Sequence, residues 1–404
     1  MKVSVRGGLF DLLAFRGLPG QRKKRIARAS AEPLAVHAVN ELARQLHPAK
    51  LHLQIIKVAQ ETASSRTYRL VADPDQGTES LPYFRAGQYL SLKVDVDGVR
   101  VTRPCSISSA PYESLGEQGF YEVTLRKIPD GFLTPFVWEH WGVGTKVESS
   151  APLGVFYHEP LRDSEQIIGL AGGSGITPFR SMAREIVSGK LAAKLLLLYG
   201  SSQPDDILFY DELLDLQRRS DNRLRTVHVL SCDGIVPEGC EQGFISAEMI
   251  RKHADPQSGT FFVCGPQAMY QFVGRELASL QVPRRRVRWE AYGEVRDIGH
   301  WPGFPTPAVG KVYRANVHIN GRRVEIPARA DETLLVAFER ANLGPPSHCR
   351  SGECGYCRSR LVSGEVFVVP ETDGRRAADR TYGFIHPCSS YPISDVEVVV
   401  PADV

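Results

Sequence analysis

The sequence has no long apolar run, no internal repeat and no low-complexity tract. None of its apolar stretches approaches the roughly 18–20 residues that a bilayer-spanning helix needs. The longest, residues 167–171 and 195–199, are typical of strands buried in a parallel sheet. Although the 404 residues include eight cysteines, no disulfide-framework spacing is visible among Cys105, Cys232, Cys240 and Cys264. We therefore expect two to four globular domains without a membrane-spanning segment.

Positive charge is concentrated in the first fifty residues. Residues 1–50 contain ten Lys and Arg and three Asp and Glu, a net charge of +7, whereas the whole chain carries +3. A basic arm of this kind is typical of segments that touch a membrane surface or an acidic partner, and a solvated tail or a helix packed on the body is the alternative. Nucleic-acid binding is not expected, because no binding motif accompanies the charge. Within the arm, an apolar stripe at helical spacing is formed by Leu34, Ala38, Leu42 and Leu46.

Between residues 51 and 148 the chain alternates apolar and polar residues in short runs that are separated by Gly, Pro and Asp. These runs predict strands at residues 51–58, 67–71, 89–96, 121–125 and 146–148. Short strands broken by turn residues are typical of a small antiparallel barrel.

From residue 167 apolar strands alternate with helical segments. We expect strands at 167–171, 193–199, 224–230 and 260–263, and helices at 179–188, 206–218 and 268–280. This alternation predicts a doubly wound parallel sheet with helices on both faces. The Gly- and Pro-rich segment 293–310 indicates a linker. Beyond it, Asn320-Gly321 predicts the turn of a hairpin in a compact mixed fold.

Near the C-terminal end, three cysteines spaced C-x4-C-x2-C are followed by a fourth: Cys349, Cys354, Cys357 and Cys388. Plant-type [2Fe–2S] ferredoxins ligate their irons with thiolates at this spacing. Gly352 and Gly355 permit backbone angles that turn amide N–H groups toward the sulfurs. A zinc site is the alternative, but zinc sites usually pair two C-x2-C knuckles and this chain has one. A reducible cluster also indicates a reducing compartment, so the cytoplasm is the expected location.

A glycine-rich turn at residues 171–178 follows a strand of the parallel sheet and opens a helix. Small residues there let a pyrophosphate approach the backbone, and the helix N-terminus offers N–H groups and a favourable dipole. The turn lacks the Rossmann G-x-G-x-x-G pattern, and close packing also selects glycine. A second turn, Cys264-Gly265-Pro266, ends another strand, with Met269 one helical turn beyond it. Two such turns at the carboxyl ends of one sheet indicate a nucleotide-binding cleft.

Two patches in the barrel region carry groups that a flavin needs. The motif Arg103-Pro104-Cys105-Ser106 lies at a strand end, and a second patch runs from Arg126 to Thr134. A flavin diphosphate needs a guanidinium, backbone donors and a hydroxyl near its phosphates, and a donor near N5, where a hydride arrives. Arg103, Thr134 and Ser106 have this chemistry. Each also has an ordinary structural explanation, as a surface Arg, a helix N-cap Thr and a turn Ser.

In order along the chain, the motifs R-P-C-S, G-x-x-T, G-G-S-G-I-T-P, C-G-P and Glu290-Ala291-Tyr292 resemble those of the ferredoxin–NADP reductase superfamily. Residues 312–404 are similar to a plant-type ferredoxin, and the whole resembles the reductase components of bacterial Rieske and other multicomponent oxygenases. The resemblance covers all but about the first fifty residues. It implies a multidomain α/β and β fold: a basic extension (1–50), an antiparallel FAD-binding β-barrel (51–158), a doubly wound NAD(P)-binding domain (159–293), a linker (294–311) and a β-grasp-like [2Fe–2S] ferredoxin domain (312–404).

The resemblance also implies roles for single residues of the barrel. Arg103 would hold the flavin phosphate and Ser106 would lie at flavin N5, whereas Cys105 replaces the family's tyrosine that stacks on the isoalloxazine. Thr134 matches the Ser or Thr at the flavin pyrophosphate, and Arg126 the basic residue before it. The flavin-binding set implied is therefore Arg103, Pro104, Cys105, Ser106, Arg126, Gly131 and Thr134.

On the nucleotide side, Cys264 matches the family's cysteine near the nicotinamide C4, and Tyr292 the aromatic residue where the nicotinamide docks on the flavin. Ser106, Cys264 and Tyr292 are thus expected at the reacting atoms. The residues expected to bind the nucleotide are Gly172, Gly173, Ser174, Gly175, Thr177, Pro178, Cys264, Gly265, Pro266 and Met269. The cluster ligands implied are Cys349, Cys354, Cys357 and Cys388.

The residues between the motifs favour particular cofactors. Residues 200–206 contain no Arg or Lys for a 2′-phosphate and end in two aspartates, so NADH is favoured. Arg223 and Arg225 on the next strand keep NADPH open. FAD is favoured over FMN because the long loop expected after Thr134 and residues 152–156 resemble the FAD branch, although an FMN-using branch shares this domain order.

Together these expectations describe an NADH-dependent flavo-iron–sulfur reductase that passes electrons from NADH through FAD and a [2Fe–2S] cluster to a partner protein such as an oxygenase. A reductase acting by itself on a small organic substrate is one alternative, although no further catalytic set supports it. A redox-sensing adaptor whose basic arm binds a regulator is another. We expect a cytoplasmic protein whose membrane contact, if any, is peripheral and made by the basic arm.

Overall fold

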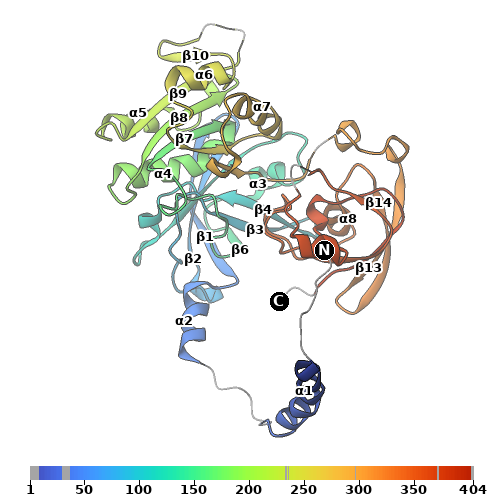
Figure 1. Ribbon diagram of the computed structural model, residues 1–404. Helices are drawn as coiled ribbons and strands as arrows, with labels where there is room; N and C mark the ends of the chain where they lie inside the picture. The colour runs from blue at the N-terminus through green and yellow to red at the C-terminus, as the bar shows by residue number, and fades with distance from the viewer. Residues whose placement is uncertain are drawn as a thin grey trace. The chain divides into compact units, whose positions relative to one another are not determined.

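The computed structural model describes residues 9–29, 37–232, 234, 236–295, 297–370 and 373–401, with side chains from residue 16 onward (Figure 1). The chain falls into two compact units, Met1–Leu46 and His47–Val404. Within the described residues, no helix combines the length and the apolar character that crossing a bilayer requires.

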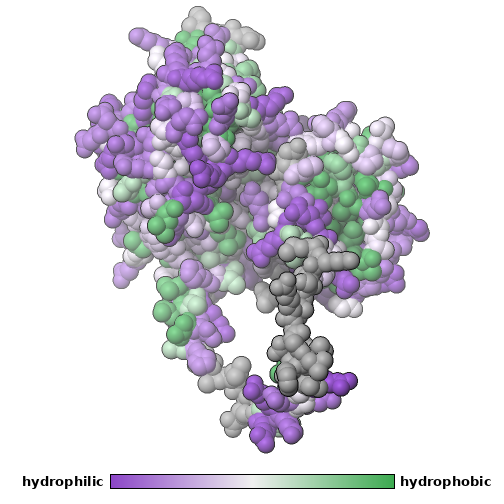
Figure 2. Space-filling model, viewed as in Figure 1, coloured by the Kyte–Doolittle hydropathy of each residue, from purple (hydrophilic) through white to green (hydrophobic). Residues whose placement is uncertain are grey.

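The first unit contains two helices, α1 (Leu9–Ala27) and α2 (Ala38–Leu46). The apolar stripe predicts α2, although its first member, Leu34, lies outside the described residues, as do three charges of the arm, Lys2, Arg6 and Glu32. No residue of α2 is buried. Its apolar side chains are exposed, and Figure 2 shows apolar surface on this helix.

The second unit begins with a six-stranded antiparallel sheet in the order β4-β3-β6-β1-β2-β5. Its strands are β1 (Leu51–Thr62), β2 (Ser65–Ala72), β3 (Tyr89–Val96), β4 (Val99–Ser106), β5 (Tyr121–Arg126) and β6 (Lys146–Ser149), and α3 (Thr134–His140) follows β5. An isolated bridge between Ile107 and Val123 joins the two edges. The sheet therefore curls around an apolar interior, as the predicted barrel does.

A six-stranded parallel sheet follows in the order β10-β9-β8-β7-β11-β12. Its strands are β7 (Gln166–Gly172), β8 (Lys194–Ser201), β9 (Leu224–Leu230), β10 (Cys240–Gln242), β11 (Thr260–Cys264) and β12 (Val287–Glu290). The four helices divide between its faces, with α4 (Thr177–Val187) and α5 (Tyr210–Arg218) on one, and α6 (Ala247–His253) and α7 (Gln267–Ser279) on the other. The predicted doubly wound sheet is confirmed.

The parallel region differs from the sequence expectation in a few elements. The helix predicted from residue 206 begins at Tyr210, because Pro204–Asp206 forms a separate 3-10 turn and Phe209 has a φ of 59°. β10 has three residues, too few to show a period. α6 is marked by Ser246, whose side chain accepts a hydrogen bond from a backbone N–H of the first turn, a typical N-cap.

The third region contains a five-stranded sheet in the order β14-β13-β19-β15-β17 and a two-stranded sheet of β16 and β18. Its elements are β13 (Val312–Ile319), β14 (Arg322–Arg329), α8 (Leu334–Arg340), β15 (Ser359–Ser363), β16 (Val366–Phe367), α9 (Ala377–Thr381), β17 (Phe384–Ile385), β18 (Tyr391–Pro392) and β19 (Val396–Val399). The β13–β14 hairpin, the parallel β13–β19 pair and α8 share one apolar core, the β-grasp-like arrangement expected. Asn320 and Gly321 have φ values of 50° and 73° and form the predicted turn.

The segment predicted as a linker packs against the third region, residues 312–401, which we call the ferredoxin region after its sequence resemblance. Val295, Ile298, Phe304 and Ala308 are buried in one apolar group together with Ala330, Val369 and Tyr391. The Tyr391 hydroxyl donates a 2.8 Å hydrogen bond to the carbonyl of Val295. The segment lacks periodicity because two short 3-10 turns, rather than a helix or a strand, bring these side chains inward.

Candidate functional site

The four predicted cluster ligands meet at one end of the ferredoxin region. Cys349, Cys354 and Cys357 lie in one loop after α8, and Cys388 lies just before β18. The Sγ atoms of Cys357 and Cys388 are 3.4 Å apart, and both side chains pack against Leu335 of α8. Cys354 is exposed, whereas the other three cysteines are buried.

Backbone amides of this loop point at the sulfurs. Four N–H groups lie 3.3–3.5 Å from a cysteine sulfur: those of Ser351, Gly352, Cys354 and Tyr356. Gly352 and Gly355 have φ values of 83° and 71°, which favour glycine and turn the amides inward as the sequence predicts. Such N–H donors stabilise thiolates that share a negatively charged cluster. The loop therefore fits a [2Fe–2S] cluster.

A single metal ion is a poorer fit to these residues. Although the four cysteines lie together, no group of three or more His, Cys, Asp or Glu side chains among the described residues is arranged to hold one metal ion. A two-iron cluster does not require that arrangement, because its four thiolates are shared between two irons. The arrangement therefore favours the cluster over the zinc alternative.

The residues expected at the reacting atoms meet where the barrel adjoins the parallel sheet. Ser106 Oγ lies 3.1 Å from the Tyr292 hydroxyl, which donates a hydrogen bond to the Glu290 carboxyl. Cys264, at the end of β11, lies beside Glu290 of β12 in the parallel register. The structure thus brings Ser106, Cys264 and Tyr292 together, and it adds Glu290, which sequence reasoning left outside the site.

Burial disfavours the charged forms of the proton-bearing groups of this centre. It raises the pKa of the Glu290 carboxyl well above its usual range, although the hydrogen bond from Tyr292 works in the opposite direction. It also raises the pKa of the Cys264 thiol and of the Tyr292 hydroxyl. A protonated carboxyl and two hydroxyls can orient a bound ring through hydrogen bonds without adding buried charge.

Tyr89 is a site residue that sequence reasoning missed. The β3–β4 hairpin turns at Asp97-Gly98, whose φ values are 52° and 80°, and it places Tyr89 opposite Ser106. The Tyr89 ring meets the Tyr292 ring edge-on, with centroids 5.7 Å apart. An Asp-Gly pair between alternating runs predicts a two-residue turn, so counting outward from it gives this pairing from the sequence.

The two turns on the nucleotide side pack directly on each other. A Cβ at Gly175 would lie 2.2 Å from the Cys264 carbonyl oxygen, and one at Gly172 would lie 2.6 Å from the Met269 sulfur. At these two positions the lack of a side chain lets the two turns pack closely against each other. Gly173 differs, because its φ is 52° and no described atom lies within 4 Å of its Cβ position. It is the glycine whose surroundings fit an approaching pyrophosphate.

The other predicted residues on the nucleotide side shape the same turns. Thr177 donates a 3.0 Å hydrogen bond to the carbonyl of Ser174, and Pro178 occupies the first turn of α4, where no N–H is needed. Gly265 N–H donates to a tyrosine hydroxyl at 3.1 Å, and Pro266 caps α7. Their contact with a nucleotide stays a prediction.

The predicted flavin pyrophosphate patch lies where the barrel meets the end of β8. Arg126 forms a 2.7 Å ion pair with Asp206, which also accepts hydrogen bonds from Thr62 at 2.7 Å and Ser64 at 2.8 Å. Arg126 Nε is buried without a hydrogen-bond partner among the described residues. A buried, unpaired guanidinium N–H suits an anionic group, so this patch fits a flavin phosphate.

Thr134 and Gly131 close the loop beside this patch. Thr134 begins α3, and its hydroxyl oxygen accepts a 2.9 Å hydrogen bond from the N–H of Ile128. A Cβ at Gly131 would lie 3.1 Å from the same oxygen. The two residues therefore fix the shape of the loop, and their contact with a pyrophosphate stays a prediction.

Arg103 has a partner that the sequence did not suggest. Its Nη1 lies 3.8 Å from the Glu339 carboxylate of α8, in the ferredoxin region. Cys105 is buried in the barrel interior, where burial raises the pKa of its thiol to about 12. Pro104 pairs with Ser91 of β3. The flavin contacts assigned to Arg103, Pro104 and Cys105 stay predictions.

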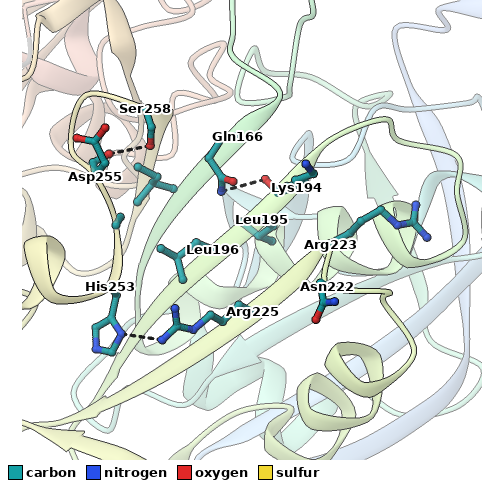
Figure 3. Close-up of a pocket in the computed structure, with 12 residues that line it drawn as sticks. Gln166, Lys194, Leu195, Leu196, Asn222, Arg223, Arg225, His253, Asp255 and Ser258 are labelled. Carbon is teal, nitrogen blue, oxygen red and sulfur yellow. Dashed lines mark hydrogen bonds between the residues drawn. The ribbon is translucent and has the colours of Figure 1, made fainter.

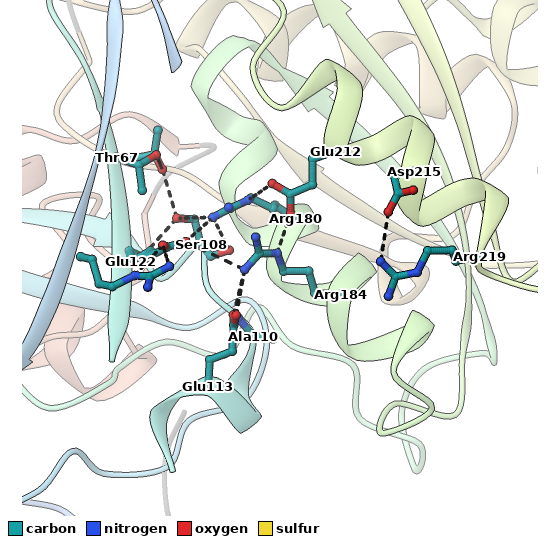
Figure 4. Close-up of polar contacts among 12 residues, drawn as sticks. Thr67, Ser108, Ala110, Glu113, Glu122, Arg180, Arg184, Glu212, Asp215 and Arg219 are labelled. Atoms are coloured by element: carbon teal, nitrogen blue, oxygen red, sulfur yellow. Dashed lines mark hydrogen bonds and ion pairs between the residues drawn. The ribbon is translucent and has the colours of Figure 1, made fainter. Parts of the chain in front are cut away.

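A network of charged side chains joins the barrel to the parallel sheet (Figure 4). Arg180 of α4 pairs with Glu122 of β5 at 2.8 Å and with Glu212 of α5 at 2.9 Å. Further ion pairs extend the network through Arg69, Glu113 and Arg184. Because α4 begins at the glycine-rich turn, the network fixes that turn relative to the barrel that carries Ser106.

A cavity of about 290 Å³ lies at the amino ends of the strands of the parallel sheet, opposite the nucleotide turns (Figure 3). Lys194 of β8 and Arg223 and Arg225 of β9 line it. Arg225 lies 3.1 Å from a ring nitrogen of His253. The nucleotide turns follow the carboxyl ends of the strands, so Arg223 and Arg225 lie away from the place where a 2′-phosphate would bind.

Three family models match successive parts of the chain. Residues 52–158 match an oxidoreductase FAD-binding domain, residues 170–275 an oxidoreductase NAD-binding domain, and residues 317–392 a 2Fe-2S iron-sulfur cluster binding domain. The order of the matches is the order of the three regions of the structure.

Relatives match the chain over most of its length. The glycine betaine monooxygenase reductase subunit of Chromohalobacter salexigens is 26% identical, over 86% of this chain and 94% of the relative. The 3-ketosteroid-9-alpha-monooxygenase ferredoxin reductase component of Mycobacterium tuberculosis is 29% identical, over 86% and 95%. Phthalate dioxygenase reductase shares the fold, with a TM-score of 0.61 and 24% identity over 87% of this chain and 97% of that one.

The structural order and the comparisons agree on three cofactor-binding parts. The curled antiparallel sheet is the FAD-binding part, the parallel sheet the NAD-binding part, and the β-grasp-like sheet the iron–sulfur part. The chain is therefore an oxidoreductase in which an FAD-binding domain and an NAD-binding domain are followed by a 2Fe-2S iron–sulfur cluster binding domain.

Proposed function

We propose that this protein is the reductase component of an oxygenase or a related redox system, and that it takes electrons from NADH and delivers them through FAD and a [2Fe–2S] cluster to a partner protein. Two relatives that match nearly their whole length are named as reductase components of monooxygenases. The three family matches account for the three cofactors of this route.

One observation carries the proposal: the β3–β4 hairpin carries the serine that is expected at the flavin, and the same hairpin contacts the cluster loop. Tyr89 of β3 pairs with Ser106, and two residues along the same strand Ser91 donates a 3.3 Å hydrogen bond to the carbonyl of His348. His348 directly precedes the cluster ligand Cys349. Burial, and next the charge of the cluster cysteines, raises the pKa of the Tyr89 hydroxyl. The hairpin that carries the serine proposed at the flavin therefore contacts the cluster loop.

FAD, when bound, supplies the chemistry between a hydride donor and a one-electron carrier, because a flavin exchanges electrons in pairs and singly. The side chains of the chain bind and orient. Ser106 offers a hydroxyl at the end of β4, and Tyr292 is held there by its hydrogen bond to Glu290. The burial of Ser106, Cys264 and Glu290 excludes water from the place where the nicotinamide and the flavin would meet.

The placement of charged residues supports NADH over NADPH. Arg223 and Arg225 are the residues that could have bound the 2′-phosphate of NADPH. Both line the cavity at the amino ends of the strands. Among the described residues of the loop after β8, no Arg or Lys is present, and Asp205 is exposed there. An exposed carboxylate suits a ribose hydroxyl and repels a phosphate.

The location and the partner are also part of the proposal. The eight cysteines are all free, which supports a reducing compartment such as the cytoplasm. Cys354 is the exposed cluster ligand, so we place the docking of the electron-accepting protein on its side of the ferredoxin domain. The basic arm is a second candidate contact, with an acidic partner or a membrane surface.

The proposal is tested with purified protein, NADH and two acceptors, ferricyanide and cytochrome c. Cys349→Ser should keep NADH oxidation with ferricyanide, which accepts electrons from the flavin, and should lose the reduction of cytochrome c through the cluster. Cys240→Ser, which changes a thiol outside the cluster, is the matched control and should retain both activities. Reduction of cytochrome c at the unaltered rate by Cys349→Ser would contradict the route, and no NADH oxidation by the unaltered protein would contradict the function.

A further inference from the structure

Arg350 occupies an unusual place in the cluster loop. It directly follows the cluster ligand Cys349, its side chain has 0% exposure, and its Nη1 donates a 2.5 Å hydrogen bond to Glu339 of α8. Its Nη2 donates at 3.2 Å to Glu294, in the segment before the ferredoxin domain. The guanidinium is therefore a buried, paired charge.

The same carboxylates also face the flavin domain. Glu339 Oε2 lies 3.8 Å from Arg103 of β4, and the Glu339 side chain is only 6% exposed. Glu294 lies near both arginines: burial works to raise its pKa, but Arg350 and then Arg103 lower it. Two positive and two negative side chains are thus gathered between β4, α8, the cluster loop and residue 294. We call Arg103, Glu294, Glu339 and Arg350 the interdomain clamp.

The backbone conformation of Arg350 indicates that the contacts of its side chain hold the residue in place. Its φ is 57°, in the left-handed region that is unfavourable for a residue with a Cβ. Gly352 and Gly355, in the same loop, have positive φ without that penalty. Strained backbone of this kind persists where the surrounding contacts over-determine it, and here those contacts are the ion pairs of the clamp.

We propose that the interdomain clamp holds the cluster loop against the flavin domain at a fixed separation. Its members are then positioning residues for the passage of one electron at a time from the reduced flavin to the oxidised cluster, with NADH as the source of the electron pair. The proposal rests on the proposed function and deepens it. It gives Arg103 a role through Glu339, different from the flavin-phosphate contact that the sequence resemblance implies.

The test is Glu339→Gln, which keeps the size of the side chain and removes the charge shared by Arg350 and Arg103. Removing one member of a buried ion pair should lower the ratio of docked to undocked ferredoxin domain about a hundredfold. In stopped flow, we expect flavin reduction by NADH at the unaltered rate and a slower reduction of the cluster. Iron and sulfide content should not change, because no cluster ligand is altered.

A second readout does not need turnover. Trypsin cleaves after arginine, and Arg350 and Ser351 of the cluster loop are both buried. In the resting protein, Glu339→Gln should be cut faster after Arg350 on limited trypsin digestion, because undocking uncovers the cluster loop. The matched control is Asp395→Asn, which breaks an exposed pair with Arg314 at 2.6 Å in the same domain and should change neither readout.

Unaltered cluster reduction together with unaltered trypsin sensitivity in Glu339→Gln would overturn the clamp. Failure of NADH to reduce the flavin in the unaltered protein would instead overturn the proposed function, and the trypsin readout would still test the clamp. If Glu339→Gln does not fold, Glu294→Gln tests the same clamp at its more exposed carboxylate.

Discussion

Burial raises the pKa of the Glu290 carboxyl well above its usual range, and this gives a pH-dependent contribution to stability. Burial is the main cause of its raised pKa, Glu353 and Cys349 add to it, and the hydrogen bond from Tyr292 opposes it. A carboxyl whose pKa is higher in the folded than in the unfolded chain binds its proton more tightly when folded. Its contribution to stability is therefore complete below about pH 4.3, the ordinary value for Glu, and is lost as the pH rises toward and through the raised pKa.

Glu290→Gln should remove this dependence, because the amide stays neutral at every pH and can still accept the Tyr292 hydrogen bond. We expect the variant to match the unaltered protein in stability near pH 4 and to exceed it increasingly at higher pH. Urea unfolding midpoints of both proteins at pH 5 and pH 8 measure this difference. A constant difference between the two pH values would show that Glu290 does not change its protonation on folding.

At the scale of the element, the two turns of the nucleotide side pack closely because glycines without a side chain lie where they meet. Gly175→Ala would bring a Cβ into the Cys264 carbonyl, 2.2 Å away, and such overpacking costs about 1–3 kcal/mol. Because the collision pushes the two nucleotide turns apart, we expect weaker NADH binding as well as a lower thermal midpoint. Tryptophan or flavin fluorescence titration with NADH measures the first, and a thermal scan the second.

Gly189→Ala is the control for this change. Gly189 follows α4, has a φ of 77° and has no described atom within 4 Å of its Cβ position. Alanine there should cost about 1–2 kcal/mol of stability, the penalty of a left-handed conformation, and should leave NADH affinity unchanged. Equal NADH affinities of the two variants would mean that the contact between the turns does not shape the nucleotide site.

Elements with a local signal could be predicted from the sequence, and contacts between distant elements could not. The hairpin at Asn320-Gly321 and the alternating strand and helix pattern depend on neighbouring residues, so they are visible in the chain. The motifs also placed Ser106 and Cys264 in one site. The pairing of Arg103 with Glu339, by contrast, depends on how two domains pack. Nothing in the sequence around either residue indicates the other. Short elements such as β10 are set by the edge of an existing sheet rather than by their own pattern.

At the scale of the whole molecule, the network of Figure 4 joins the flavin and nucleotide domains through buried charges. Arg180 has a side chain that is 6% exposed and reaches Glu122, which is 7% exposed. Arg180→Met should therefore cost about 3–5 kcal/mol, because it leaves a buried carboxylate with one partner fewer. The fixed angle between the two domains would loosen, so flavin reduction by NADH should slow as well.

Asp215→Asn is the control within the same figure. It breaks the exposed 3.0 Å pair of Asp215 with Arg219, which is worth about 0–1 kcal/mol. Thermal midpoints and stopped-flow flavin reduction compare the two variants. A loss of stability in Arg180→Met no larger than that in Asp215→Asn would show that the buried pairs do not hold the domains together.

The packing of residues 295–308 also decides where the chain can be divided. This segment supplies Phe304 and Ala308 to the same apolar group as Tyr391, and the carbonyl of Val295 holds the Tyr391 hydroxyl. A ferredoxin piece cut at residue 312 would expose that group and leave a buried hydroxyl without its acceptor. If ferredoxin domains are exchanged between reductases, the fusion point should therefore lie before Val295. Glu294 then lies at the fusion point, so the partner of Glu294 in the cluster loop, Arg350, must be kept in the introduced domain.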